Sequence, residues 1–235
     1  MASSKDFLNP EWGRIIVRFN LIFLSLFFIP HFLKAQGEAD IWYIGPSNGI
    51  DFSSGSPVIK TGFVGSPYGA GSASISDANG HLLFYTNGET VWNRNNIPMH
   101  NGMNLNGASS WQILITKKPG AESLYYIFYI PDFHNGTTEL YYSQVDMSLD
   151  GGLGDVTQEK NILLQDSVEQ KLTTALNSDG KDIWIISHSL YGNAFYSFLV
   201  TANGVSRNAV ISHAGKIFSN GQIGYLLGQM VTSPD

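Results

Sequence analysis

The 235-residue chain contains no cysteine and few charged residues. The absence of cysteine excludes disulfides, thiolate zinc sites and cysteine nucleophiles. Asp, Glu, Lys and Arg make up 14% of the chain, well below the usual quarter, whereas surface helices normally carry a charged face. The net charge is −6, and Lys117-Lys118 is the one basic cluster after the first 20 residues. A nucleic-acid partner needs a basic surface, so we expect none.

Glycine and aromatic residues are abundant instead. The chain has 25 glycines, aromatic residues make up 13% of it and hydrophobic residues 43%. Glycine supplies the positive φ that tight turns need, and aromatic residues favour strands. This composition predicts short strands joined by tight turns around a large core.

The N-terminus has the pattern of a secretory signal peptide. Arg14 and Arg18 precede an apolar run over residues 21–29, and the small residue Ala35 follows. The run of about nine residues is too short for a membrane anchor, which needs ~20. We therefore expect residues 1–35 to be a signal peptide, a secreted or cell-surface location, and no membrane span after its removal. The long segment before the apolar run leaves a later start codon as an alternative.

The rest of the chain predicts an all-β protein. Apart from the signal peptide, no segment keeps a helical period for three turns. The segment 168–176 could form a short helix, although Thr173 and Thr174 disfavour it. Three strands are expected within 74–95, "SISDANGHLLFYTNGETVWNRN". Further strands are expected at 40–44, 58–60, 112–116, 124–130, 139–147, 161–165, 172–177, 182–187, 194–201 and 209–213.

The strands recur in a repeated order. A turn precedes an aromatic strand at Asp77–Gly80, at Pro119–Glu122 and at Ser178–Lys181, and the Asp77 and Gly80 of the first turn recur as Asp179 and Gly180. Four strands in about 40 to 60 residues are typical of a β-propeller blade. We predict that residues 36–235 form an incomplete, truncated β-propeller of four-stranded blades, because 233–235 look like a further copy that is cut off. A β-sandwich with irregular loops is the alternative.

The repeated segments resemble a known protein family. They include "DFSSGSPV", "ASISDANGHLLFYTNGETVWN", "YYSQVDMSLDGGLGDV", "EQKLTTALNSDGKDIWIISH", "NAFYSFLVTANGVS" and "IGYL…SPD". Together they resemble the N-terminal propeller-like region of large secreted Bacteroidetes surface proteins, which carry PKD-type domains and a gliding-motility or type IX sorting domain. The resemblance covers about residues 40–235. It implies export and cell-surface display, with little chemistry.

Residues that suggest catalysis or metal binding lack the required patterns. Asp146, Asp150 and Asp155 are spaced by four and five residues, unlike an EF-hand loop, and favour a turn over a calcium site. The histidines form no zinc motif, and no Gly-x-Ser-x-Gly elbow occurs. We expect no cofactor, no metal and no enzymatic activity. A propeller hydrolase or lyase is the least favoured alternative, and it requires His188 and His213 to converge with an acidic residue.

Aromatic residues are the remaining candidates for binding. Trp92 and Trp184 could stack on a ligand such as a sugar, although aromatic residues in blades often belong to the core. The sequence thus predicts a non-catalytic, exported cell-surface protein that acts as a scaffold or binding module, for example in adhesion to a protein or glycan ligand. A carbohydrate-binding module is the alternative.

Overall fold

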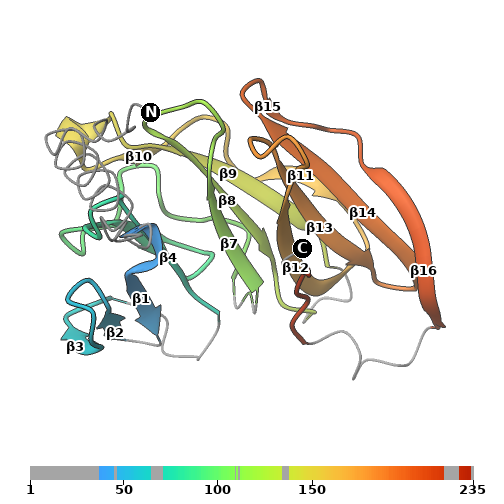
Figure 1. The fold of residues 1–235 in the computed structure, drawn as a ribbon, viewed down its shortest axis with the longest axis horizontal. Helices are drawn as coiled ribbons and strands as arrows, with labels where there is room; N and C mark the ends of the chain where they lie inside the picture. The colour runs from blue at the N-terminus through green and yellow to red at the C-terminus, as the bar shows by residue number, and fades with distance from the viewer. Residues whose placement is uncertain are drawn as a thin grey trace, which may run out of the picture. The chain divides into compact units, whose positions relative to one another are not determined.

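Four antiparallel β-sheets, each built from strands that are consecutive in the chain, make up the described part of the protein (Figure 1). The computed structural model describes residues 37–44, 47–64, 71–108, 110, 112–133, 138–219 and 228–233. These residues belong to the unit formed by 36–235. The predicted signal peptide, 1–35, lies outside the described residues. The all-β prediction is confirmed.

We number the sheets 1 to 4 in chain order. A short 3₁₀ helix, η1 (Gly37–Ala39), precedes sheet 1, and another, η3 (Asp150–Gly152), lies within sheet 3 between β9 and β10. The strands are β1 (Ile41–Ile44), β2 (Asn48–Asp51) and β3 (Val58–Thr61) in sheet 1; β4 (Ala73–Ser76), β5 (Leu82–Thr86) and β6 (Val91–Asn93) in sheet 2; β7 (Gln112–Lys117), β8 (Leu124–Ile130), β9 (Leu140–Asp146), β10 (Asp155–Val156) and β11 (Ile162–Gln165) in sheet 3; and β12 (Val168–Leu176), β13 (Ile183–Ser189), β14 (Gly192–Thr201), β15 (Gly204–Val205) and β16 (Val210–Phe218) in sheet 4.

The predicted strands are present, although β12 begins four residues earlier and β16 ends five residues later than predicted. The possible helix at 168–176 is the strand β12. Strands β2, β10 and β15 were not predicted, and in β2 the Asn48-Gly49 pair resembles a turn. Gly49 has a packing role instead: a Cβ there would lie 2.5 Å from the ring of Phe63. Glycine inside a strand commonly marks such a close approach.

Two of the three repeated turns share one geometry, although their alignment differs from the prediction. Gly80 and Gly180 have φ values of 85° and 69°. The N–H of each donates to the carbonyl oxygen three residues earlier, at Asp77 and Asn177 respectively. Asp77 is therefore matched by Asn177 and not by Asp179, because the backbone and not the carboxylate defines the turn.

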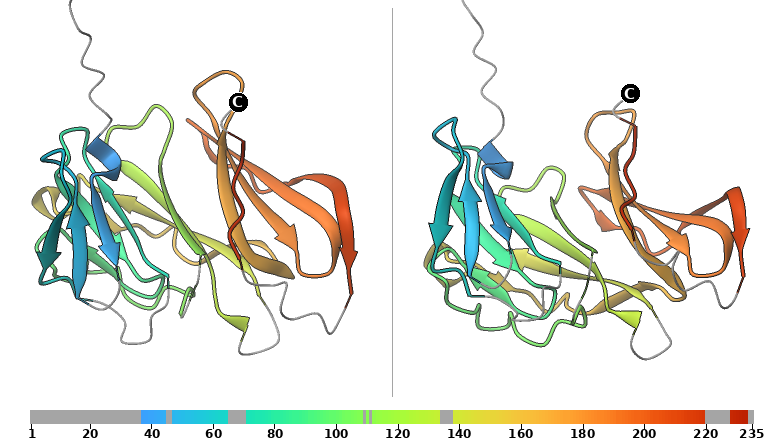
Figure 2. Two further views of the ribbon diagram at one scale, coloured as in Figure 1. Left: turned by 60° about the horizontal axis from the view of Figure 1, so that its bottom comes forward. Right: turned by 90° about the horizontal axis from the view of Figure 1, so that it is seen from below.

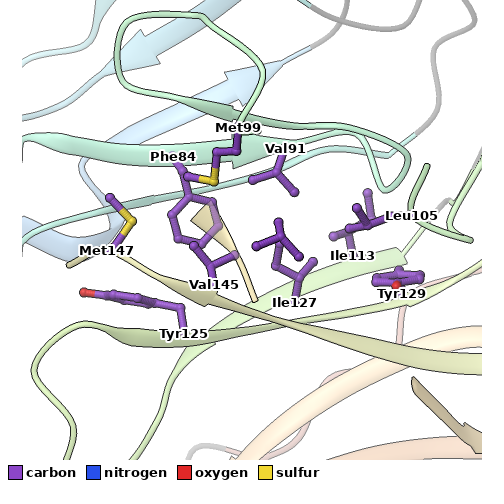
Figure 3. Close-up of a cluster of buried hydrophobic side chains, with 11 residues drawn as sticks. Phe84, Val91, Met99, Leu105, Ile113, Tyr125, Ile127, Tyr129, Val145 and Met147 are labelled. Atoms are coloured by element: carbon purple, nitrogen blue, oxygen red, sulfur yellow. The ribbon is translucent and has the colours of Figure 1, made fainter. Parts of the chain in front are cut away.

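Consecutive sheets bury apolar side chains between them, so sheet 3 is covered on both faces. Side chains alternate along a strand, and β8 uses both sides. Ile127 and Tyr129 pack with residues of sheet 2, as Figure 3 shows. Phe128 and Ile130 pack with residues of sheet 4. The core is therefore a series of layers, one between each pair of successive sheets.

The first strands of successive sheets lie next to one another: β1 contacts β4, β4 contacts β7, and β7 contacts β12. Hydroxyl groups join two of these strands, because Ser74 Oγ donates to Ile41 O at 2.7 Å and Ser72 Oγ to Tyr43 O at 2.8 Å. A similar bond, 2.9 Å long, joins Thr232 Oγ1 to Thr174 O. Figure 2 shows the red segment 228–233 running along β12.

Loss of a side chain from the layer between sheets 3 and 4 should destabilise the protein strongly. Phe128 is fully buried, and Phe128→Ala should lower the free energy of unfolding by about 3–5 kcal/mol. Urea denaturation measures the change. The control Leu163→Ala removes a side chain from β11 that is 50% exposed, and it should cost less than about 0.5 kcal/mol. Equal losses in the two variants would contradict this packing.

Asp51 should make stability depend on acidic pH. Hydrogen bonding from Ser53, reinforced by the Lys60 ammonium group 2.9 Å away, lowers the pKa of Asp51 to about 2. The unfolded value is about 3.9, so ionised Asp51 stabilises the fold above about pH 4. That contribution is lost as the pH falls towards 2. In melting curves from pH 5 to 2, Asp51→Asn should lose less stability than the wild type, whereas the exposed control Glu122→Gln should match it. If the melting temperature of Asp51→Asn fell with pH as steeply as that of the wild type, the ionised Asp51 and its contacts with Ser53 and Lys60 would contribute nothing to stability.

Candidate functional site

The two predicted ligand-stacking tryptophans lie in different surroundings. Trp92 is 6% exposed and belongs to the layer between sheets 1 and 2. Its ring stacks on that of Tyr85, with centroids 5.3 Å apart and planes 15° apart. Trp184, on β13, is half-buried and lines a groove on sheet 4. In this structure Trp184, rather than Trp92, borders open space.

The Trp184 groove combines an apolar floor with a polar rim, in a volume of about 340 Å³. Trp184 and Leu199 are paired across β13 and β14, so their side chains share one face of sheet 4. Val210, at the start of β16, adds to this floor. The rim comes from the β14–β15 hairpin and the loop after it, namely Thr201, Asn203, Gly204, Val205, Ser206 and Asn208.

Local hydrogen bonds fix the groove. The backbone N–H of Asn203 donates to Thr201 Oγ1 at 3.0 Å, which holds the hairpin turn. Ser206 Oγ donates to Asn208 O at 2.9 Å. On β13, Trp184 Nε1 donates to Asn177 Oδ1 at 3.2 Å, which fixes the edge of the indole. Asn203 and Asn208 are exposed, so their amides lie at the rim, open to solvent.

A second hollow, the Glu169 cavity, lies on the same sheet and has a volume of about 290 Å³. Its walls combine buried charge with apolar surface. Two further segments bound it, the part of β16 around Gly215, where its pairing with β14 is irregular, and the segment 228–233. The lining residues are Glu169, Lys171, His188, Phe195, Ala214, Gly215, Lys216, Gln229 and Met230.

A bulge in β12 creates this cavity's charged wall. Val168 pairs with Ser189, yet Leu172 pairs with Ser187, so β12 has two more residues than β13 in this interval. The extra residues interrupt the alternation, and the consecutive side chains of Glu169 and Gln170 are both buried. Bulges often redirect side chains next to functional sites. The sequence did not point to Glu169 as a candidate, because the bulge becomes visible only in the pairing of β12 with β13.

Glu169 is a buried carboxylate with one satisfied oxygen. It is 1% exposed. Its Oε2 accepts a hydrogen bond from Lys171 Nζ at 2.7 Å and lies 3.6 Å from His188 Nδ1. Its Oε1 has no hydrogen-bond partner. Buried polar atoms are nearly always paired, so this oxygen is a marker of possible function.

His188 lies against Glu169, but the histidine pair that a hydrolase would use does not form. His188 Nδ1 is 2.9 Å from the backbone oxygen of Ser189, and its ring packs edge-on against Phe195, with centroids 4.7 Å apart. His213 is exposed, and its Nδ1 lies 3.2 Å from Asn193 Oδ1. The structure thus brings one histidine, not two, to the acidic residue.

Two of the three aspartates considered for calcium accept hydrogen bonds from backbone groups instead. Asp146 Oδ1 accepts from the N–H of Ser148 at 2.9 Å. Asp155 Oδ1 accepts from the N–H of Asn101 at 2.8 Å. Asp150 is an exposed turn residue with a φ of 49°. Within the described ranges, no three His, Asp or Glu residues are grouped so that they could hold a metal ion.

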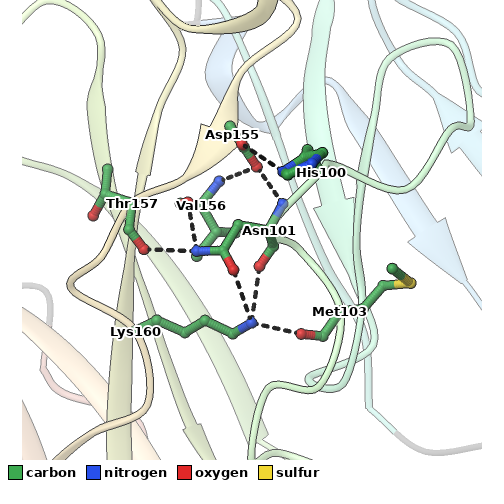
Figure 4. A network of polar contacts seen from close by, with 7 residues as sticks. All are labelled: His100, Asn101, Met103, Asp155, Val156, Thr157 and Lys160. Carbon is green, nitrogen blue, oxygen red and sulfur yellow. Dashed lines mark hydrogen bonds and ion pairs between the residues drawn. The ribbon is translucent and has the colours of Figure 1, made fainter.

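Asp155 belongs to a polar network that ties the loop after β6 to the segment around β10 (Figure 4). Lys160 Nζ lies between three oxygens, donating to Asn101 O at 3.0 Å, Asn101 Oδ1 at 3.3 Å and Met103 O at 2.7 Å. The Asn101 amide donates to the backbone oxygens of Val156 and Thr157. Because the ammonium group fills the space among the oxygens, the network acts as a clamp between sheets 2 and 3.

No protein-family model matches the chain, and neither a curated protein nor a solved structure matches it. Within the described residues, no helix has the length and apolar character that crossing a membrane requires. Function is therefore inferred from the residues of this chain, and the outer face of sheet 4, turned away from sheet 3, carries both hollows.

Proposed function

We propose that the chain is a non-catalytic, exported cell-surface binding module built as a partial β-propeller. The observation that carries the binding role is the Trp184 groove, where an aromatic floor meets a rim of amides and hydroxyls. Small-molecule sites usually combine apolar walls with a few placed polar groups. Export and display at the cell surface rest on the signal-peptide pattern of residues 1–35.

The propeller architecture is supported by the way in which the sheets stack. Blades of a propeller are antiparallel sheets whose strands follow in chain order, and each blade packs its faces on its neighbours. Sheets 1 and 2 follow this order, and sheets 3 and 4 follow it except that β11 pairs with β9 and β16 with β14. The first strands β1, β4, β7 and β12 are successive neighbours. The hydroxyl bond from Thr232 to β12 resembles those from Ser72 and Ser74 to β1. Segment 228–233 thus runs beside β12 much as the residues of sheet 2 run beside β1.

Carbohydrate is the ligand class that the Trp184 groove favours. Sugars have apolar C–H faces that stack on aromatic rings, and hydroxyl groups that pair with amides. Trp184 supplies the ring, and Asn203 and Asn208 supply exposed amides at the rim. A charged ligand fits less well, because none of the described residues that line this groove is ionised. A second candidate function, within the binding role, is therefore that of a carbohydrate-binding module.

Carbohydrate binding should depend on Trp184. On a glycan array and in calorimetry, Trp184→Ala should weaken binding by about tenfold or more, since stacking on the ring is lost. Trp184→Phe should retain part of the affinity. The control Trp42→Ala removes a tryptophan that is 52% exposed on sheet 1, and it should bind as the wild type does. Equal binding by Trp184→Ala and the wild type would exclude the groove as the site.

Export should leave a processed N-terminus. Protein recovered from the surface or medium fraction of its own cells should begin near Gln36, because signal peptidase cleaves after a small residue such as Ala35. N-terminal sequencing measures this. Recovery of the chain from the cytoplasm with residues 1–35 still attached would contradict export.

A further inference from the structure

The two hollows of sheet 4 open on the same face. Side chains four residues apart on a strand point to the same side, and Trp184 and His188 have this spacing on β13. Their partners across β14 are Leu199 and Phe195. The pair Trp184 and Leu199 lines the Trp184 groove, and the pair His188 and Phe195 lines the Glu169 cavity. Four residues of strand span about 13 Å, so a ligand reaching both hollows must be extended.

The Glu169 cavity holds a carboxylate oxygen that can accept a hydrogen bond from a ligand. Glu169 Oε1 is buried without a partner, whereas Oε2 is held by Lys171. Leaving a buried carboxylate oxygen unpaired costs stability, and the β12 bulge turns this side chain inward despite that cost. A ligand that donates to Oε1 would remove the penalty.

A hydroxyl group fits this wall better than a charged group does. It can donate to the Glu169 carboxylate and accept from the Lys171 ammonium group at the same time, because a hydroxyl is both donor and acceptor. An anion would meet Glu169, and an added cation would meet Lys171 and Lys216, which also lines the cavity. Phe195 and Met230 provide apolar surface in the same cavity. Neighbouring hydroxyl groups on an apolar ring are the chemistry of a sugar.

We propose that the outer face of sheet 4 binds an extended oligosaccharide at two subsites. One sugar stacks on Trp184, and another, further along the chain, places its hydroxyl groups between Glu169 and Lys171 in the Glu169 cavity. This inference rests on the proposed carbohydrate-binding function, and it adds the second subsite and a minimum ligand length.

The test is the dependence of affinity on oligosaccharide length. Calorimetry on the purified protein uses β-1,4-linked glucose and β-1,4-linked N-acetylglucosamine oligomers of one to six units. In the series that binds, affinity should rise steeply once the oligomer spans both hollows. Glu169→Gln should weaken the long oligomers by about tenfold or more, the cost of a lost charged hydrogen bond, and leave the shortest binders unchanged. Trp184→Ala should weaken all lengths.

Two further variants separate binding from folding. The control Glu122→Gln changes an exposed carboxylate in the turn between β7 and β8, and it should keep the wild-type length dependence. If Glu169→Gln unfolds, the double variant Glu169→Gln, Lys171→Met removes both partners, so no buried charge is left unpaired. It should fold, as judged by circular dichroism, and lose the length dependence.

The outcomes that overturn the proposals differ. Binding that needs Trp184 but shows no rise with length, or a Glu169→Gln loss that is equal for short and long oligomers, overturns the second subsite alone. Absence of binding to oligomers of every length overturns the carbohydrate function too, and it is the result expected if a further β-sheet occupies this face.

Discussion

The burial of side chains on both faces of sheet 3 is the constraint on which the other layers depend. Antiparallel sheets often leave one face to water, with polar residues on that side. Strand β8 has no such side, because every residue from Leu124 to Ile130 is apolar or aromatic. Both faces must be covered, and sheets 2 and 4 cover them. The repeated stacking follows from this two-sided strand.

Sheets 1 and 4 each leave one face without a covering sheet in the described part of the chain. On sheet 1 that face is apolar: Trp42 and Ile59 are 52% and 77% exposed. On sheet 4 the corresponding face is divided into two hollows, one beside exposed amides and the other against a buried carboxylate. The amides and the carboxylate make the face of sheet 4 suited to a polar ligand, whereas the face of sheet 1 is suited only to apolar packing.

Charged side chains have two different roles in this fold. At Lys160 the ammonium group is surrounded by oxygens of the chain itself, so its hydrogen bonds are used within the protein and hold two sheets together. At Glu169 one oxygen remains unpaired, although the side chain is almost fully buried. Because such an atom is costly, the contrast separates a structural network from a centre that is suited to a ligand.

The sequence by itself determined the all-β class, most of the strands and the repeated turns. These features are local: alternation, aromatic runs and turn glycines act within a few residues, so they can be read without the fold. Only the tertiary structure decided that Trp184 borders a groove while Trp92 is stacked on Tyr85. It also revealed Glu169 beside His188, 19 residues apart in the chain. The physical reason is that a strand's pattern shows that its faces are buried, but not which sheet covers them or where a bulge redirects a side chain.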